Sequence, residues 1–212
     1  MKAVLFDMDG VLVNSEPVII EASLRTLRKY GVEAKETDFK EFTGMGDDLF
    51  IGGVARKYGV EYDPKMKAEA YEVYFEIIDE LIGKFPGVLP LIALLKEKGY
   101  TLAVASASDL VKVKANLKAL GASEDDFAAI ITGSDVERKK PFPDIYLKAA
   151  AAIGADPSEC IVIEDAISGT QAGVAAGMIV ECVTTSFPAE PLWNACASWV
   201  FDDIYSVSEI VS

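Results

Sequence analysis

The chain has 212 residues, of which 51% are apolar and 25% charged, a composition typical of a folded globular protein and not of a disordered one. Its 34 acidic and 20 basic residues give a formal charge of −14, which disfavours nucleic acid and anionic membranes as partners. The chain contains no histidine, so any catalytic arrangement that depends on a histidine base is excluded.

Short β-rich runs alternate along the chain with stretches of helical spacing. The runs read as mostly apolar rather than alternating, as expected for strands that are covered on both faces of a parallel sheet. This alternation predicts an α/β protein with a doubly wound, Rossmann-like parallel sheet. The predicted strands cover residues 3–6, 102–105, 129–132, 160–163 and 179–183, with a further edge strand at 199–201.

The alternation is interrupted once, after the first predicted strand. About ninety residues there contain no comparable strand, and their apolar spacing indicates helices. We therefore predict a helical cap at residues 17–84, inserted after the first strand of a catalytic core formed by residues 1–16 and 85–212. Three aromatic residues of this segment are expected in the core of the cap: Tyr71, Tyr74 and Phe75.

The three cysteines, Cys160, Cys182 and Cys196, do not show the Cys-x-x-Cys spacing of a structural zinc site. We expect them to be small core residues. No apolar run has the length of a signal peptide or of a membrane span, which favours a soluble, cytoplasmic protein without a membrane partner. The sequence gives no indication of the oligomeric state.

Polar side chains follow four of the predicted strands, where ligands bind in open parallel sheets. An acid pair and a glycine come after the first strand, and a serine ends the second. A lysine pair followed by proline comes after the third strand, and a second acid pair after the fourth. These residues are Asp7, Asp9 and Gly10; Ser106; Lys139, Lys140 and Pro141; and Glu164 and Asp165.

This set of side chains favours phosphoryl chemistry. Crowded carboxylates repel one another unless a cation lies among them, and oxygen ligands with open positions suit Mg²⁺. A metal and a lysine beside a carboxylate would neutralise the charged oxygens of a phosphoryl group while an aspartate attacks phosphorus. A carboxylate with a pKa of about 4 is ionised at neutral pH and needs no histidine to activate it.

In these motifs the chain resembles the haloacid dehalogenase superfamily, and within it the capped phosphatase and β-phosphoglucomutase-like group. The first motif, Asp-x-Asp-Gly after a strand, corresponds to residues 7–10, and the second to Ser106. Lys140 with Pro141 corresponds to the third motif, and the acid pair Glu164 and Asp165 to the fourth. Each motif alone is weak, but all four occur in the expected order, and the resemblance covers essentially the whole chain.

The resemblance implies a role for each of these residues. Asp7 would be the nucleophile that forms an aspartyl-phosphate, and Asp9 would protonate the leaving oxygen and later activate water. Ser106 and Lys140 would bind the transferring phosphoryl group. Mg²⁺ would be held by Asp7, by the backbone carbonyl of Asp9, and by Asp165 with Glu164 nearby. The implied substrate is the phosphate monoester of a small metabolite, similar to a sugar phosphate.

Two assignments within the motifs leave an alternative open. Lys139 stands beside Lys140 and either could be a solvated charge, although the following proline favours Lys140. Ser108 competes with Ser106, but we expect Ser108 to cap the helix that begins at Asp109.

A phosphosugar mutase of the β-phosphoglucomutase type is the main alternative function. Such mutases typically carry an arginine just after the glycine-containing cap loop and a histidine early in the first cap helix. Here the loop leads into Asp47, and Ile19 is the nearest match to the histidine. An aspartate that faces a second phosphate would oppose binding, so we favour the phosphatase.

A non-catalytic regulatory or phospho-acceptor module is an alternative from another class. Receiver-type modules also use acids, Mg²⁺, a hydroxyl and a lysine on a doubly wound sheet. Their phospho-acceptor follows a later strand than their acid pair, however, and they do not need a long helical insertion. A silent domain would also be free to lose one of the four motifs, and this chain retains all of them.

Overall fold

The structure is a computed structural model that describes residues 2–207. Residues 1 and 208–212, which belong to the predicted core, lie outside the described residues. The described residues form a six-stranded sheet in the order β5-β4-β1-β6-β7-β8, with every neighbouring pair parallel. The doubly wound α/β fold predicted from the sequence is thereby confirmed. The strands are β1 (Ala3–Phe6), β4 (Thr101–Ser106), β5 (Ala129–Thr132), β6 (Cys160–Glu164), β7 (Ile179–Val183) and β8 (Trp199–Phe201).

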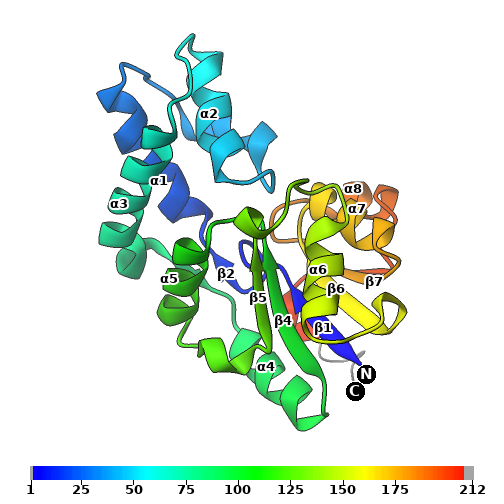
Figure 1. Ribbon diagram of the computed structural model, residues 1–212. Coiled ribbons are helices and arrows are strands. Elements are labelled where there is room, and N and C mark those ends of the chain that lie inside the picture. Colours follow the sequence, from blue (N-terminus) through cyan, green and yellow to red (C-terminus); the bar gives the residue numbers. More distant parts are fainter. Residues whose placement is uncertain (1, 208–212) are drawn as a thin grey trace.

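Helices cover both faces of this sheet, which explains why its central strands are continuously apolar (Figure 1). All four residues of β1 are buried, because this strand pairs with β4 on one side and β6 on the other. One face packs against α4 (Val88–Glu97), α5 (Leu110–Leu120) and α9 (Ile204–Val207). The other packs against α6 (Asp144–Ala152), α7 (Ile167–Ala175) and α8 (Ala189–Asn194).

The segment between β1 and β4 contains a helical unit, which we call the cap. It is entered through β2 (Val13–Asn14) and left through β3 (Gly83–Lys84), and these two short strands pair antiparallel to each other. Figure 1 shows the cap helices gathered beyond one end of the sheet. Their apolar faces form a separate core that includes Phe39, Ile51 and Tyr74. The cap elements are α1 (Glu16–Lys29), the 3₁₀ helix η1 (Glu36–Phe42), α2 (Asp47–Lys57) and α3 (Pro64–Leu81).

Local signals account for the helix ends. At the start of α3 the Asp63 side chain accepts a hydrogen bond from the Lys65 amide, and Pro64 occupies the first helical position. Helix α5 ends where Gly121 adopts a left-handed conformation with φ +93°. Short 3₁₀ turns cover Glu124–Asp126, Gly133–Asp135 and Pro157–Glu159.

None of the helices in residues 2–207 combines the length and the apolarity that crossing a membrane requires.

Three details differ from the expectations. Asp109, and not Ser108, is the N-cap residue of α5, because the Ser108 hydroxyl is directed to Asp9 instead. Cys160 and Cys182 are buried as expected, but Cys196 is exposed, since it lies in the turn after α8 with φ +69°. Tyr71 and Tyr74 belong to the cap core, whereas Phe75 is 41% exposed on the outer side of α3.

Candidate active site

Asp7 and Asp9 lie at the carboxyl end of the central strand β1. The Asp7 amide donates to the carbonyl of Ile163 at 3.0 Å, so the parallel pairing with β6 continues one residue beyond the strand. The chain then turns at Gly10, which has φ +90°. A β-carbon on Gly10 would lie 1.8 Å from Oδ2 of Asp165, so only glycine fits this turn.

Three carboxylates meet next to a lysine at this end of the sheet. Each of Asp7, Glu164 and Asp165 offers an oxygen, and these oxygens lie within 4.8 Å of one another. The Lys140 ammonium is 2.6 Å from Oδ1 of Asp7 and 2.6 Å from Oε1 of Glu164. All four side chains are buried, so their charges interact with little screening by solvent.

Glu164 is held in place by the start of α7. Its Oε2 accepts hydrogen bonds from the amides of Asp165 and Ala166, both at 2.8 Å. The Tyr146 hydroxyl donates to Oε1 at 2.9 Å. A β-carbon on Gly169 would lie 1.6 Å from the same oxygen, so this glycine makes room for the carboxylate. Glu164 is thus a fixed anion that orients Lys140.

Lys140 supplies one positive charge beside three carboxylates, so it does not balance the cluster when all three are ionised. Burial, opposed by the Lys140 ammonium and reinforced by the Glu164 carboxylate, raises the pKa of Asp7 to about 7. Burial, together with the charges of Glu164 and Asp7, raises the pKa of Asp165 well above its usual value. Crowded, buried oxygen ligands with excess negative charge fit a hard divalent cation such as Mg²⁺.

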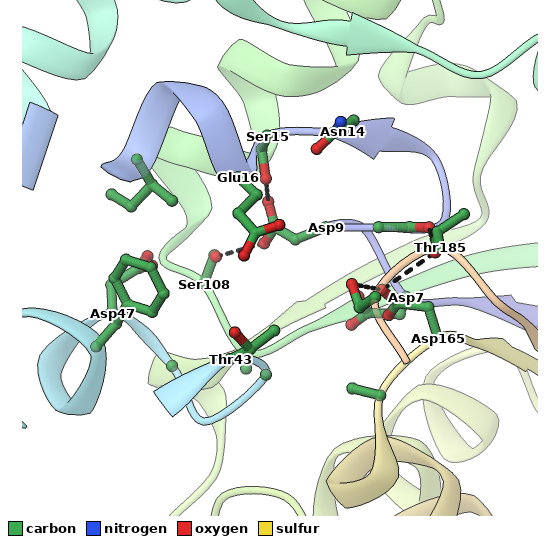
Figure 2. A pocket seen from close by; sticks show the side chains of 18 of the residues that line it. Asp7, Asp9, Asn14, Ser15, Glu16, Thr43, Asp47, Ser108, Asp165 and Thr185 are labelled. Carbon is green, nitrogen blue, oxygen red and sulfur yellow. Dashed lines mark hydrogen bonds between the residues drawn. The ribbon is translucent and has the colours of Figure 1, made fainter. Parts of the chain in front are cut away.

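Asp9 points away from this cluster, into a network of donors. Its carboxylate accepts hydrogen bonds from the hydroxyls of Ser15 and Ser108, the latter at 2.7 Å, and from the Asn116 amide at 3.1 Å. The Lys112 ammonium lies 3.4 Å from Oδ1. Burial would raise the pKa of Asp9, but the Lys112 charge and the two hydroxyls outweigh it, so the pKa is lowered. Figure 2 shows Ser15 and Ser108 converging on Asp9 from opposite sides.

Ser106 is placed differently from the other predicted site residues. It ends β4, is fully buried, and its Oγ accepts a hydrogen bond from the Ser108 amide at 3.1 Å. Its side chain is not among the described groups that line the cavity, whereas Ser108 is.

Lys139 donates to the carbonyl of Gly133 and does not reach the carboxylates, so Lys140 is the lysine brought to the acid cluster.

A partly open cavity of ≈180 Å³ connects these groups and lies between the sheet and the cap. This is smaller than the roughly 300–1,000 Å³ of pockets for drug-sized ligands, which favours a small metabolite. The cap loop touches the core directly, since the Ser168 hydroxyl donates to the carbonyl of Gly44 at 3.3 Å. A β-carbon on Gly44 would lie 2.9 Å from that of Ala166, which explains the glycine at this contact.

Several polar residues of the site were not singled out from the sequence. Lys112 and Asn116 follow the candidate Ser108 at intervals of four residues, so they lie on one face of the α5 segment, and this spacing was the available signal. Thr185 and Ser186 follow β7, and both hydroxyls donate to Asp165, Thr185 at 3.3 Å. They could have been found by also examining the residues after the fifth strand.

A capped, doubly wound sheet with an acidic pair, a lysine and a second acidic pair at the ends of its strands defines a class of α/β hydrolase. The model of the haloacid dehalogenase-like hydrolase family matches residues 4–183, and the chain belongs to this family. The resemblance inferred from the four motifs is therefore confirmed.

Known proteins similar to this chain include phosphatases. Hexitol phosphatase B of Escherichia coli is 31% identical over 186 residues, which cover 83% of this chain and 80% of that protein. The Arabidopsis thaliana protein SUPPRESSOR OF QUENCHING 1, chloroplastic, is 44% identical over 98% of this chain, but the chain spans only 20% of its length. The crystal structure of CbbY from Rhodobacter sphaeroides in complex with phosphate has a TM-score of 0.86 and 27% identity, covering 98% of this chain and 96% of that one.

Proposed function

We propose that this chain is a Mg²⁺-dependent phosphatase that hydrolyses the phosphate monoester of a small, sugar-phosphate-like metabolite. The observation that carries the proposal is the buried cluster in which Lys140 bridges Asp7 and Glu164 beside Asp165. The similarity to hexitol phosphatase B and to a CbbY structure with bound phosphate supports it.

Asp7 is the proposed nucleophile. One of its carboxylate oxygens attacks phosphorus, an aspartyl-phosphate forms, and the bond between phosphorus and the ester oxygen breaks. Lys140, only 2.6 Å from Oδ1 of Asp7, orients this carboxylate and offers positive charge to the phosphoryl oxygens. Ser106 is the second proposed phosphate-binding residue; it is fully buried, and its Oγ accepts a hydrogen bond from the amide of Ser108, which lines the cavity.

Asp9 is the proposed acid and base. When protonated, it delivers its proton to the leaving ester oxygen, and as a carboxylate it then accepts a proton from the water that attacks the aspartyl-phosphate. The products are the alcohol and inorganic phosphate, and Asp7 is regenerated. The donors around Asp9 favour its carboxylate form, which suits the second half of the reaction.

The proposed Mg²⁺ ligands are the carboxylates of Asp7 and Asp165 and the backbone carbonyl of Asp9, with Glu164 adjacent. A bound Mg²⁺ supplies positive charge that offsets the phosphoryl oxygens and the crowded carboxylates. Thr185 and Ser186 fix the orientation of Asp165 by donating to its Oδ2.

The test is phosphate release from p-nitrophenyl phosphate and from a panel of sugar phosphates, with Mg²⁺ and with a chelator. We expect turnover only with the metal, and turnover that is independent of any divalent ion would refute the proposed site. Asp7→Asn should abolish turnover, whereas Asp9→Asn should slow it by about 10²–10⁴-fold. A phosphoenzyme that is trapped by acid quench and disappears on chase would separate a phosphatase from a phospho-acceptor module.

Two residues that line the cavity favour a phosphatase over a mutase. Ile19 and Asp47, which occupy the positions expected to hold a histidine and an arginine in mutases, both line the cavity. Neither side chain offers positive charge to a second phosphate. Including a β-glucose 1-phosphate assay primed with a sugar bisphosphate in the panel would detect mutase activity directly.

A further inference from the structure

The cap side of the cavity contains an ion pair between Lys112 and Asp47, and the proposed reaction assigns no role to Asp47. Asp47 begins α2, and the Lys112 ammonium of α5 lies 3.1 Å from its Oδ1. The Tyr71 hydroxyl donates to Oδ2 of Asp47 at 2.6 Å. Asp47 and Lys112 are only 8% and 2% exposed, so this pair is buried between the cap and the core.

The positive charge of Lys112 is already balanced within this arrangement. Its ammonium is shared between Asp47 and Asp9, and it also donates to the Ser108 hydroxyl at 3.0 Å. The other cation among the described residues that line the cavity is Lys140, which is paired with Asp7 and Glu164. A second anionic group on a substrate would therefore find no unpaired cation in this lining.

Negative charge dominates the cap side of the cavity. The carboxylates of Asp9, Glu16 and Asp47 line it, with Lys112 as the cation among them. Figure 2 shows Asp47 on the cap side of the pocket, with Asp7 and Asp165 on the sheet side. Like charges a few ångströms apart in a partly buried site repel strongly, whereas carboxylate and hydroxyl oxygens accept hydrogen bonds from substrate hydroxyls.

We propose that Asp47, held by Lys112 and Tyr71, makes the cap side of the cavity a subsite for an uncharged, hydroxylated group. The enzyme then accepts the monophosphate of a sugar or polyol and rejects the corresponding bisphosphate. Asp47 is a specificity-determining residue in this scheme, because it cancels the charge of Lys112 and repels a second phosphate. This inference rests on the proposed phosphatase function of the same cavity.

Binding to a form that cannot turn over tests the proposal. In the Asp7→Asn background with Mg²⁺, calorimetric titration compares glucose 6-phosphate with glucose 1,6-bisphosphate, and fructose 6-phosphate with fructose 1,6-bisphosphate. We expect the better-bound monophosphate to bind at least about tenfold more tightly than its bisphosphate, because the repulsion acts only on the second phosphate. Adding Asp47→Asn should reduce this ratio at least about fivefold, mainly by tightening bisphosphate binding.

Asp48→Asn is the matched control, because Asp48 is the next residue of α2 and its side chain is 54% exposed and paired with Lys67. With Asp48→Asn the ratio of monophosphate to bisphosphate affinity should equal that of Asp7→Asn alone. Glu16→Gln removes one negative charge from the cap side of the cavity at an exposed position. It should also reduce the ratio of monophosphate to bisphosphate affinity, so it tests the proposal should Asp47→Asn fail to fold. If the ratio of monophosphate to bisphosphate affinity is near one, or if neither Asp47→Asn nor Glu16→Gln changes it, the proposed subsite is wrong. The proposed phosphatase function is not contradicted by that result. Failure of all four sugar phosphates to bind overturns both proposals.

Discussion

Gly10 and Asp165 approach each other so closely that a β-carbon on Gly10 would lie 1.8 Å from Asp165 Oδ2. The two residues follow different strands, β1 and β6, and are 155 positions apart in the sequence. The glycine at the turn after β1 therefore determines where the last carboxylate of the proposed metal site can lie.

Gly10→Ala should weaken Mg²⁺ binding by about 10–100-fold, because the new methyl group displaces the Asp165 carboxylate. The measurement is the Mg²⁺ concentration that gives half-maximal thermal stabilisation. Gly31→Ala is the control, since Gly31 also has a positive φ, +76°, but a β-carbon there would meet nothing within 4 Å. Equal Mg²⁺ affinities in the two variants would contradict the role of the close contact.

Lys140→Met should destabilise the metal-free protein by about 3–5 kcal/mol, because Asp7 and Glu164 lose their buried counter-charge. Mg²⁺ should restore part of this loss, so the stabilisation by Mg²⁺ should be larger in the variant than in the parent. Urea unfolding with and without Mg²⁺ measures both effects. Lys139→Met, one residue away, is the control and should leave the response to Mg²⁺ unchanged. An unaltered Mg²⁺ response in Lys140→Met would argue against a cation among these carboxylates.

Tyr74→Phe should weaken the contact between the cap and the core. The Tyr74 hydroxyl of α3 donates to Oδ1 of Asn116 on α5 at 2.6 Å, and both residues are fully buried. Without it the Asn116 oxygen is left unpaired, which costs about 1–3 kcal/mol in the free energy of unfolding. Because Asn116 also donates to Asp9, we expect kcat to fall as well.

Tyr58→Phe provides the comparison for this variant. It removes a hydroxyl that donates to Asp38 at 2.7 Å in an exposed pair within the cap. Chemical denaturation and steady-state kinetics should show a smaller loss of stability and an unchanged kcat. Similar losses in the two variants would mean that the bond between Tyr74 and Asn116 has no special role.

Glu181→Gln should stabilise the protein at neutral and alkaline pH. Glu181 is 1% exposed, and its Oε2 has no hydrogen-bond partner among residues 2–207. Burial raises its pKa from 4.5 to about 7. Between these values the folded state keeps the proton that the unfolded state releases, so the stability of the parent falls as the pH rises from about 4.5 through 7.

Thermal melts at pH 5 and pH 8.5 check this prediction. The glutamine variant should match the parent at the lower pH and exceed it at the higher one. Glu190→Gln changes an exposed glutamate on α8 and should show no such dependence. A stability gain of the Glu181 variant that is equal at both pH values would contradict a protonated Glu181.

Local patterns were sufficient to predict the sheet and the order of the motifs. The runs at 129–132 and 179–183 coincide with β5 and β7, because parallel strands covered on both faces are mostly apolar, and Glu181 is the one acidic residue in these two strands. Asp7, Glu164 and Asp165 could be expected to meet because they lie at or directly after the ends of paired parallel strands, whose carboxyl ends share one edge of the sheet.

What the sequence alone determined is therefore which strands form and which end of the sheet carries the chemistry. Only the tertiary structure decided the partners of each side chain. Asp9 turns to the α5 face and the cap, the Ser108 hydroxyl goes to Asp9 and not to the helix start, and Lys112 is shared with Asp47. These choices depend on side-chain direction and on burial between segments up to about a hundred residues apart, which no local spacing records.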